Sequence, residues 1–258
     1  MSRNTLFCLD IGNTSLSYGL YRKGRFVLIG RESSDRFPHF RRKLIGIINK
    51  NPISYILVTS VVPEITLKLS KLAGKLPRKT HCLIVGKSIS IPIRHKYRKG
   101  SQLGWDRLVN AWGAQRIYGA PVLILDYGTA LTCDLVSKAG VFEGGLIIPG
   151  PEVAFKALSR QARLLPSLKF PSKAKEFIGR NTVSGMRSGI LQAYGAMTDG
   201  LVQRFRQRFG RRLRAVATGG YAKVLSAYSR EIDVLDPLLT LKGLVEVFKA
   251  SKFSKIPS

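Results

Sequence analysis

Short apolar runs, each bounded by turn residues, dominate the first half of the chain. LFCLD, SLSYGLY and RFVLIGR are typical of three strands, the latter two joined by a turn at Lys23 and Gly24. A helix around FRRKLIGIINK, the apolar run ISYILVTSVV, a helix from Pro63 to about Leu72 and the strand HCLIVG follow. The pattern predicts the order β-β-β-α-β-α-β.

The second half repeats this order. VLILD, ALTCDLV and VFEGGLII predict three more strands, again with a Lys and Gly turn, SKAG, between the second and third. We then expect helices at about 152–162 and 182–209, the strand RAVATGG, a helix around AKVLSAY, the strand EIDVLD and a closing helix. This duplication favours an α/β protein with two lobes, residues 1–118 and 119–258, facing each other across a cleft.

The first strand of each copy ends on a carboxylate, Asp10 or Asp126, followed within two residues by a glycine. The glycine allows a tight turn, and the N–H and hydroxyl groups after it can face an anion. Phosphoryl transfer needs such donors together with carboxylates for cations. A single turn of this kind is usually only a turn, but two at matching positions favour a phosphorylated nucleotide as ligand.

Three segments contribute candidate residues to this chemistry. They are Asp10, Gly12, Asn13 and Thr14; Asp126, Gly128, Thr129 and Thr132; and a possible third anion-binding turn at Thr218, Gly219 and Gly220.

An amphipathic helix with Asp106 in its first turn is predicted over residues 103–119, LGWDRLVNAWGAQRIYG. One interpretation is a capping acid that suits the helix dipole, next to a surface arginine. The other is a general base, Asp106, next to an anion-binding Arg107. The residues alone leave both open.

Basic residues far outnumber acidic ones. The chain has 43 Lys+Arg against 15 Asp+Glu, a formal net charge of +28 at pH 7. RHKYRKG, SLKFPSKAK and RFRQRFGRRLR are dense, yet basic residues also lie almost everywhere else. In the last segment and the residues before it, Leu201, Phe205 and Phe209 fall four apart, which favours an amphipathic helix with solvated basic faces over a nucleic-acid surface. We therefore expect no nucleic-acid partner.

The remaining chemistry-bearing residues are few. Cys8, Cys82 and Cys133 lack CxxC spacing and are typical of reduced core residues, and the three histidines lack metal-ligand spacing. No run has the length and apolarity of a signal or a membrane span. The sequence thus predicts a cytoplasmic protein without a membrane partner.

Seven motifs in order identify a family. The chain contains DIGNT at 10–14, TSVVP at 59–63, GWDR at 104–107, DYGTALTCD at 126–134, GGLIIPG at 144–150, IGRNTVSGMRSG at 178–189 and TGG at 218–220. It resembles the type III pantothenate kinases over nearly its whole length. The resemblance implies a fold of duplicated ribonuclease H-like (actin-like ATPase) domains, with mixed β-sheets flanked by helices and a nucleotide cleft between the lobes.

The resemblance also implies an activity and its residues. Such an enzyme phosphorylates pantothenate to 4′-phosphopantothenate, the first step of coenzyme A biosynthesis, using Mg-ATP and a monovalent cation (K⁺ or NH₄⁺), as a cytoplasmic homodimer. Asp106 would be the catalytic base, and Asp126 would hold the monovalent cation. ATP would be bound by Asp10, Ile11, Gly12, Asn13, Thr14, Ser15, Leu16, Ser17 and Thr129. Pantothenate would be bound by Tyr97, Gly104, Trp105, Asp106, Arg107 and Thr182.

The chain departs from the family pattern in its basicity, in Trp105, where a small residue is common, and in Ser15, where Asn is frequent. Two alternatives follow. One is a non-enzymatic regulator of the same fold that uses its basic surface to bind nucleic acid; the other is a related kinase for another small hydroxy acid. The presence of Asp10, Asp106 and Asp126 favours an enzyme over the regulator.

Overall fold

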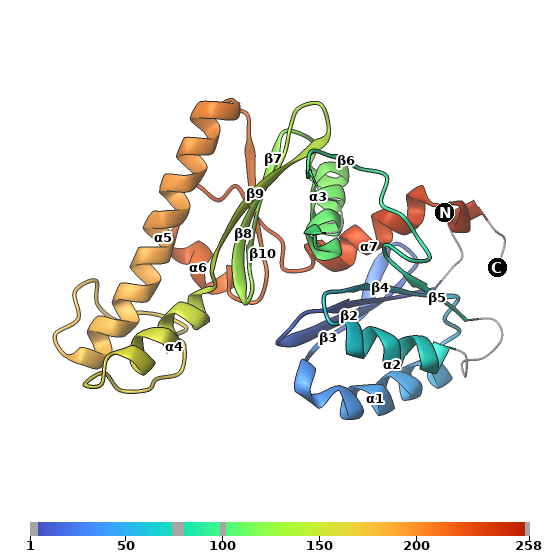
Figure 1. Ribbon diagram of the computed structural model, residues 1–258, viewed down its shortest axis with the longest axis horizontal. Coiled ribbons are helices and arrows are strands. Elements are labelled where there is room, and N and C mark those ends of the chain that lie inside the picture. Colours follow the sequence, from blue (N-terminus) through green and yellow to red (C-terminus); the bar gives the residue numbers. More distant parts are fainter. Residues whose placement is uncertain (1–4, 74–79, 99–101, 256–258) are drawn as a thin grey trace. The chain divides into compact units, whose positions relative to one another are not determined.

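The computed structural model describes residues 5–73, 80–98 and 102–255 (Figure 1). Its strands are β1 (Leu6–Ile11), β2 (Ser15–Arg22), β3 (Arg25–Ser33), β4 (Tyr55–Ser60), β5 (His81–Ile84), β6 (Arg94–His95), β7 (Val122–Tyr127), β8 (Ala130–Val136), β9 (Val141–Pro149), β10 (Arg214–Thr218) and β11 (Val234–Leu235). Its α-helices are α1 (Phe37–Lys50), α2 (Pro63–Ala73), α3 (Trp105–Tyr118), α4 (Pro151–Gln161), α5 (Thr182–Phe209), α6 (Ala222–Leu225) and α7 (Leu239–Ala250). Short 3₁₀ helices lie at Ser34–Arg36, Ser226–Tyr228 and Lys252–Lys255.

The two sheets have the same strand topology, which confirms the predicted duplication. The first has the order β3-β2-β1-β4-β5, in which β2 is antiparallel to both of its neighbours, β1 and β3, and β4 and β5 are parallel to β1. The second has the order β11-β10-β7-β8-β9-β6, so β7 occupies the place of β1. The two-residue strand β6 on the edge next to β9 was not predicted.

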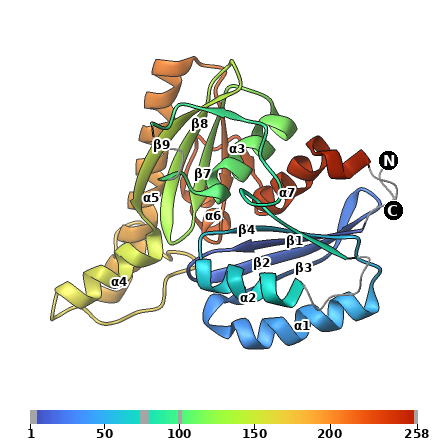
Figure 2. The same ribbon diagram turned by 45° about the vertical axis from the view of Figure 1, so that its right-hand side comes forward.

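Helices cover both faces of the first sheet (Figure 2). On one face, Phe7, Leu9 and Ile11 of β1 join a buried cluster with residues of α1 and α2. On the other face α7 packs against β1 and β4, and the Tyr55 and Phe248 rings lie 4.8 Å apart. Because it is enclosed on both faces, β1 is a continuous apolar run, whereas the edge strand β3 is largely exposed.

The second sheet buries one face against α5 and α6. Leu123, Leu125 and Tyr127 of β7 form a cluster with Leu191 and Tyr194 of α5, among others. The Tyr127 hydroxyl lies 2.6 Å from the Thr198 hydroxyl, so its polar end is satisfied inside the core. The helix α5 begins with a capping box in which Asn181 accepts from the Ser184 N–H at 2.9 Å.

The chain forms two compact units. One comprises residues 1–93, 98–116 and 239–258, and the other residues 94–97 and 117–238. The predicted boundary after residue 118 lies close to the change at 116–117, but the closing helix α7 groups with the first unit. The sequence-based division placed α7 in the second lobe because chain order alone does not show that its apolar residues pack on the first sheet.

Two smaller expectations concern core and membrane residues. Cys8, Cys82 and Cys133 are unpaired, as predicted, and Cys8 and Cys133 are buried. Within the described residues, no helix has the length and apolar character to cross a membrane.

Candidate functional site

Asp10 and Asp126 occupy equivalent positions in the two sheets. In β1 the residues on either side of Asp10, Leu9 and Ile11, point into the α1/α2 cluster, so alternation directs Asp10 to the opposite face. In β7 the neighbours Leu125 and Tyr127 likewise point into the α5/α6 cluster. Both carboxylates therefore lie at the carboxyl end of a central strand, on the face away from those helices, and both are half-buried.

Each carboxylate is flanked by hydroxyl residues on both neighbouring strands. Asp10 lies opposite Ser17 of β2 and Thr59 of β4, and Asp126 lies opposite Thr132 of β8 and Thr218 of β10. Residues in register on adjacent strands share a face, so the hydroxyls lie beside the carboxylates. The result is a row of oxygen donors and acceptors at the carboxyl ends of the central parallel strands of each sheet. We call this the carboxyl edge of the sheet, and it is where open α/β sheets bind ligands.

The turn after Asp10 is open. The Gly12 N–H donates to the Ser15 carbonyl at 2.9 Å, and Asn13 and Thr14 are exposed. Ser34 supports the turn through two hydrogen bonds. Its hydroxyl donates to the Gly12 carbonyl at 2.7 Å, and its N–H donates to the Thr14 carbonyl at 3.1 Å. This leaves the outer side of the turn available for an anion.

The turn after Asp126 is enclosed by backbone. The Gly150 N–H donates to the Thr129 carbonyl at 3.0 Å, and a Cβ on Gly150 would overlap this turn. Gly219 has a φ of +94°, and a Cβ there would lie 2.7 Å from the Tyr127 nitrogen and overlap the Asp126 carboxylate. The predicted third turn, TGG, therefore packs directly against Asp126.

Asp106 lies in the first turn of α3, as predicted. Its carboxylate accepts from the Arg107 N–H at 2.9 Å, and a Cβ on Gly104 would overlap it. Burial raises the pKa of Asp106 above its ordinary value, and the Arg107 N–H and charge oppose this rise only in part. A carboxyl group with a raised pKa at the edge of a site is suited to accept a proton. Arg107 itself is 8% exposed.

Close glycine contacts fix α3 within the first unit. A Cβ on Gly113 of α3 would lie 2.7 Å from the Gly243 Cα of α7, so the two helices touch backbone to backbone. At the start of α3, the Trp105 ring lies over Gly86, which has a φ of +80° and follows β5. These contacts place Asp106 at the same carboxyl edge of the sheet as Asp10, because β1 and β5 are both parallel to β4.

The remaining predicted binding residues lie in the second unit. Tyr97 packs against β9, where its ring centroid lies 6.1 Å from that of Phe142 and close to Gly144. Thr182 is the exposed first residue of α5. Arg98–Arg116, which include the GWDR segment, belong to the first unit, whereas Tyr97 and Thr182 do not.

Sequence reasoning missed two buried polar residues of these edges. The Thr59 hydroxyl, beside Asp10, is buried without a hydrogen-bond partner among the described residues. Asp134 is 1% exposed and accepts from the Thr132 hydroxyl at 3.1 Å. The sequence signal for Thr59 was its place at the end of an apolar run, which Thr218 shares. Asp134 had no such signal, because a carboxylate in a strand of alternating polarity normally points to solvent.

The donor set fits the cations of phosphoryl transfer. No group of three His, Cys, Asp or Glu side chains that could enclose a metal occurs in residues 5–73, 80–98 and 102–255. Mg²⁺ with a nucleotide needs only one or two carboxylates, since phosphates and water complete its shell. Asp10 meets that need, and Asp126 between two hydroxyl residues offers the oxygen ligands that a monovalent cation takes.

Comparisons with known proteins agree with this geometry. The family model described as type III pantothenate kinase matches residues 6–204. A conserved protein assigned to the Baf family of transcriptional activators from Campylobacter jejuni has a similar structure, with a TM-score of 0.56 and 17% identity over 94% of this chain and 96% of that one.

Two further solved structures share the fold. The activator of 2-hydroxyisocaproyl-CoA dehydratase from Clostridium difficile, with bound ADPNP, has a TM-score of 0.53 and 13% identity over 97% of each chain. The ethanolamine utilization protein EutJ from Carboxydothermus hydrogenoformans has a TM-score of 0.55 and 12% identity over 96% of this chain and 91% of that one. These likenesses confirm the predicted actin-like ATPase fold. The chain belongs to the type III pantothenate kinase family, and this membership implies a kinase that uses ATP with a divalent metal ion.

Proposed function

We propose that the protein phosphorylates pantothenate on its terminal hydroxyl, with ATP as phosphoryl donor. The observation that carries the proposal is the family match over residues 6–204, a span that contains every proposed site residue from Asp10 to Thr182. The geometry supports it, because each sheet presents a carboxylate among hydroxyl groups and Asp106 lies at the same edge as Asp10.

The first unit would bind the phosphates and activate the acceptor. The open turn from Asp10 to Ser17 offers N–H and hydroxyl donors to phosphate oxygens. Asp106 would accept the proton of the pantothenate hydroxyl as that oxygen attacks the γ-phosphorus. Its raised pKa makes it a stronger base than an ordinary aspartate.

Residues of the second unit would contact ATP and hold the monovalent cation. Thr129 is exposed in the enclosed turn and would contact ATP, and Asp126 would hold K⁺ or NH₄⁺. Bound Mg²⁺ and the monovalent cation offset the charge of the phosphates during transfer. The pantothenate carboxylate would be bound by Arg107. Tyr97, Gly104, Trp105 and Thr182 are the further residues proposed to bind pantothenate, and a homodimer is part of the same proposal.

Trp105 limits which acceptor molecules can bind beside Asp106. Its ring covers Gly86, and 39% of the residue remains exposed. It therefore stands beside Asp106 as a rigid apolar wall, which suits the gem-dimethyl part of pantothenate. The second candidate, a kinase for a different small hydroxy acid, rests on the same residue, because Trp105 stands where a small residue is common in the family and so changes the shape of the acceptor site.

Mass detection of phosphopantothenate tests the proposal. The purified protein is incubated with Mg-ATP, K⁺ and pantothenate, in parallel with Asp106→Asn. We expect product from the native chain and a loss of turnover of about 10²–10⁴-fold in the variant, with ATP binding retained. Product from other hydroxy acids but none from pantothenate would favour the second candidate, and unchanged turnover in the variant would exclude Asp106 as the base.

A further inference from the structure

A surface of arginines lies at the end of the second sheet opposite Asp126. Asp126 is at the carboxyl end of β7, whereas Arg214 pairs with Val122 at its start. A strand rises about 3.3 Å per residue, so roughly 13 Å separates the two ends. This charge is therefore remote from the phosphate-binding turn of the same sheet, and the kinase chemistry does not account for it.

Several elements bring basic side chains to this end. Figures 1 and 2 both place the end of α5 and the β8–β9 turn at one end of the unit, away from α4. Register agrees, because Val122 at the start of β7 pairs with Val136 at the end of β8 and the start of β9 pairs with Arg94. We call this surface the basic end; it comprises Arg94, Lys138, Arg204, Arg208, Arg211, Arg212 and Arg214.

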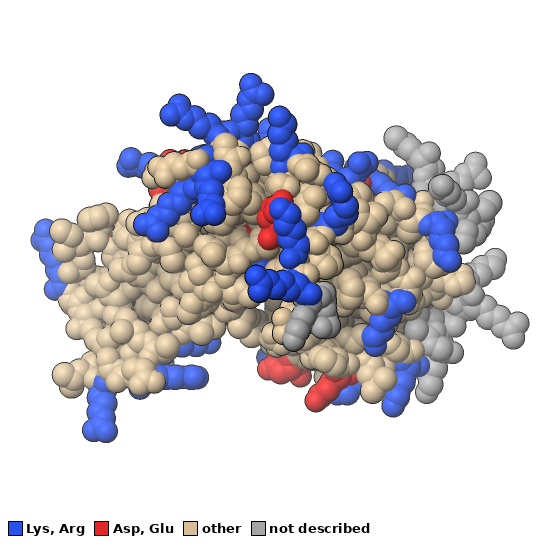
Figure 3. Space-filling model, turned by 45° about the horizontal axis from the view of Figure 1, so that its top comes forward, with Lys and Arg blue, Asp and Glu red and all other residues tan. Residues whose placement is uncertain are grey.

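The basic end has few acids to neutralise it. Arg206 is paired with Glu231 and, at 2.7 Å, with Asp233. Within the described part of the chain, the Arg211 and Arg212 side chains are exposed and have no hydrogen-bond or ion-pair partner, and the Arg214 guanidinium donates only to the Tyr118 carbonyl. Figure 3 shows Lys and Arg spread over the visible face, with few Asp or Glu.

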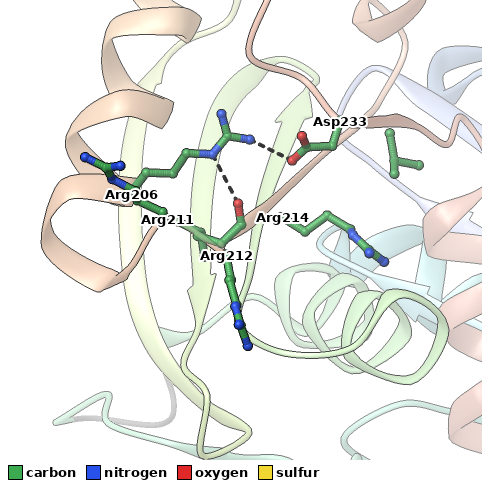
Figure 4. Close-up of a pocket in the computed structure, with 7 residues that line it drawn as sticks. Arg206, Arg211, Arg212, Arg214 and Asp233 are labelled. Atoms are coloured by element: carbon green, nitrogen blue, oxygen red, sulfur yellow. Dashed lines mark hydrogen bonds and ion pairs between the residues drawn. The ribbon is translucent and has the colours of Figure 1, made fainter.

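A cavity of about 390 Å³ opens here, lined by Arg206, Arg211, Arg212, Leu213, Arg214, Asp233 and Val234. Figure 4 shows Arg206 directed to Asp233, whereas Arg212 and Arg214 extend away from that pair. Four arginines with one aspartate make the cavity electropositive. Guanidinium groups bind phosphate oxygens in a bidentate manner, so the cavity is suited to a phosphodiester.

An exposed aromatic ring adds a second kind of contact. Phe209, the last residue of α5, is 42% exposed; its ring stacks on Phe205 at 5.8 Å, and the Arg208 guanidinium lies 5.9 Å from its centre. Cations along a groove together with exposed aromatic faces are the features by which proteins hold single-stranded nucleic acid. A membrane surface would make no use of a concave arginine-lined cavity.

We propose that the basic end binds the phosphate backbone of single-stranded nucleic acid, with Arg211 and Arg212 contacting phosphates and Phe209 stacking on a base. Binding is independent of sequence and steeply dependent on salt. The sequence predicted that RFRQRFGRRLR forms a helix with one apolar face and solvated basic faces. This holds for Phe205, which packs on the core, but the arginines after it gather on one surface rather than around a helix.

Fluorescence anisotropy of a labelled oligouridine, measured over a salt series, tests the proposal. We expect Arg211→Gln/Arg212→Gln to weaken binding roughly tenfold near physiological salt and to reduce the salt slope by about 1.4, since each single-strand phosphate contact contributes about 0.7. The control Arg41→Gln/Arg42→Gln removes the same charge from exposed positions of α1 and should change affinity less than about twofold.

Further variants separate the contributions of the individual contacts, and a second ligand tests which kind of partner binds. Arg204→Gln/Arg208→Gln, a second variant of the basic end, should also weaken binding, and Phe209→Leu should do so several-fold without changing the salt slope. Thermal unfolding checks that each variant is folded. Equal losses in the α1 control and the Arg211/Arg212 variant, no binding by the native chain, or binding to phosphatidylserine vesicles but not to the oligonucleotide would each overturn the proposal.

Discussion

The two sheets present the same carboxylate in the same place, but the turns that follow are built differently. The Asp10 turn is open and is supported by side chains that include Ser34 and Arg31, whose guanidinium donates to the Ser15 hydroxyl at 2.9 Å. The Asp126 turn is enclosed by the backbone of Gly150 and Gly219. An open turn can change shape around the phosphates of a nucleotide, whereas an enclosed one keeps its oxygens at fixed positions, as a bound cation requires. Duplication has thus supplied two copies of one element that suit different ligands.

The units differ again in where the proposed base lies. The first unit carries Asp106 on α3, a helix whose backbone touches that of α7 at Gly113 and Gly243. Variants that change one unit and spare the other therefore separate the proposed cation binding at Asp126 from proton transfer.

The largest effect should be on the pH dependence of turnover. As the base, Asp106 must be ionised, so kcat should fall about tenfold per pH unit once the pH drops below the raised pKa. The profile would come from the first unit alone, and substitution of Asp126 should lower kcat without moving its midpoint. A midpoint that moves with the Asp126 substitution would assign the titration to the second unit.

The same pKa shift has a consequence for stability. The folded state binds the Asp106 proton more tightly than the unfolded state, so this group stabilises the fold at low pH, and the contribution is lost as the pH rises through the raised pKa. Asp106→Asn should therefore flatten this part of the stability profile. Urea unfolding of both proteins between acidic and neutral pH measures it, and parallel profiles would contradict the raised pKa.

Gly219→Ala should show how strongly the second turn depends on backbone contact. The residue has a φ of +94°, and a Cβ would lie 2.7 Å from the Tyr127 nitrogen, so we expect a loss of about 3 kcal/mol, or roughly 6–12 °C in Tm. Gly12→Ala in the first turn meets only the Ser15 carbonyl, at 3.2 Å, and should cost less than about 1 kcal/mol. Equal losses would show that the two turns are equally enclosed.

Gly113→Ala should displace Asp106 without touching it. The added Cβ would meet the Gly243 backbone at 2.7 Å, so α3 and α7 must separate, at a cost of about 1–3 kcal/mol. We expect kcat to fall more than the affinity for ATP. Gly46→Ala is the matched control, because its Cβ meets nothing within 4 Å in α1, and it should stabilise by about 0.5–1 kcal/mol. An unchanged kcat in Gly113→Ala would show that α3 does not position the base.

The sequence predicted the repeated strand order and the two carboxylates because both depend on local patterns. Apolar runs that end on Asp10 and Asp126 mark strand ends, and the helix limits at Thr182 and Phe209 follow from the caps of α5. What depends on long-range packing was not predictable. The placement of α7 on the first sheet and the difference between the two turns come from backbone contacts between segments far apart in the chain.

The smallest effect should come from Ser34→Ala, which removes one side-chain support of the open turn. Its hydroxyl donates to the Gly12 carbonyl at 2.7 Å, so the loss should be about 1 kcal/mol, expressed mainly as a roughly threefold to tenfold weaker affinity for ATP. Ser33→Ala is the control, since the Ser33 hydroxyl reaches the Thr14 carbonyl only at 3.5 Å. ATP affinity measured by calorimetry distinguishes them. If both variants bind ATP like the native chain, Ser34 does not support the turn, and the backbone bonds within it are sufficient to shape the phosphate site.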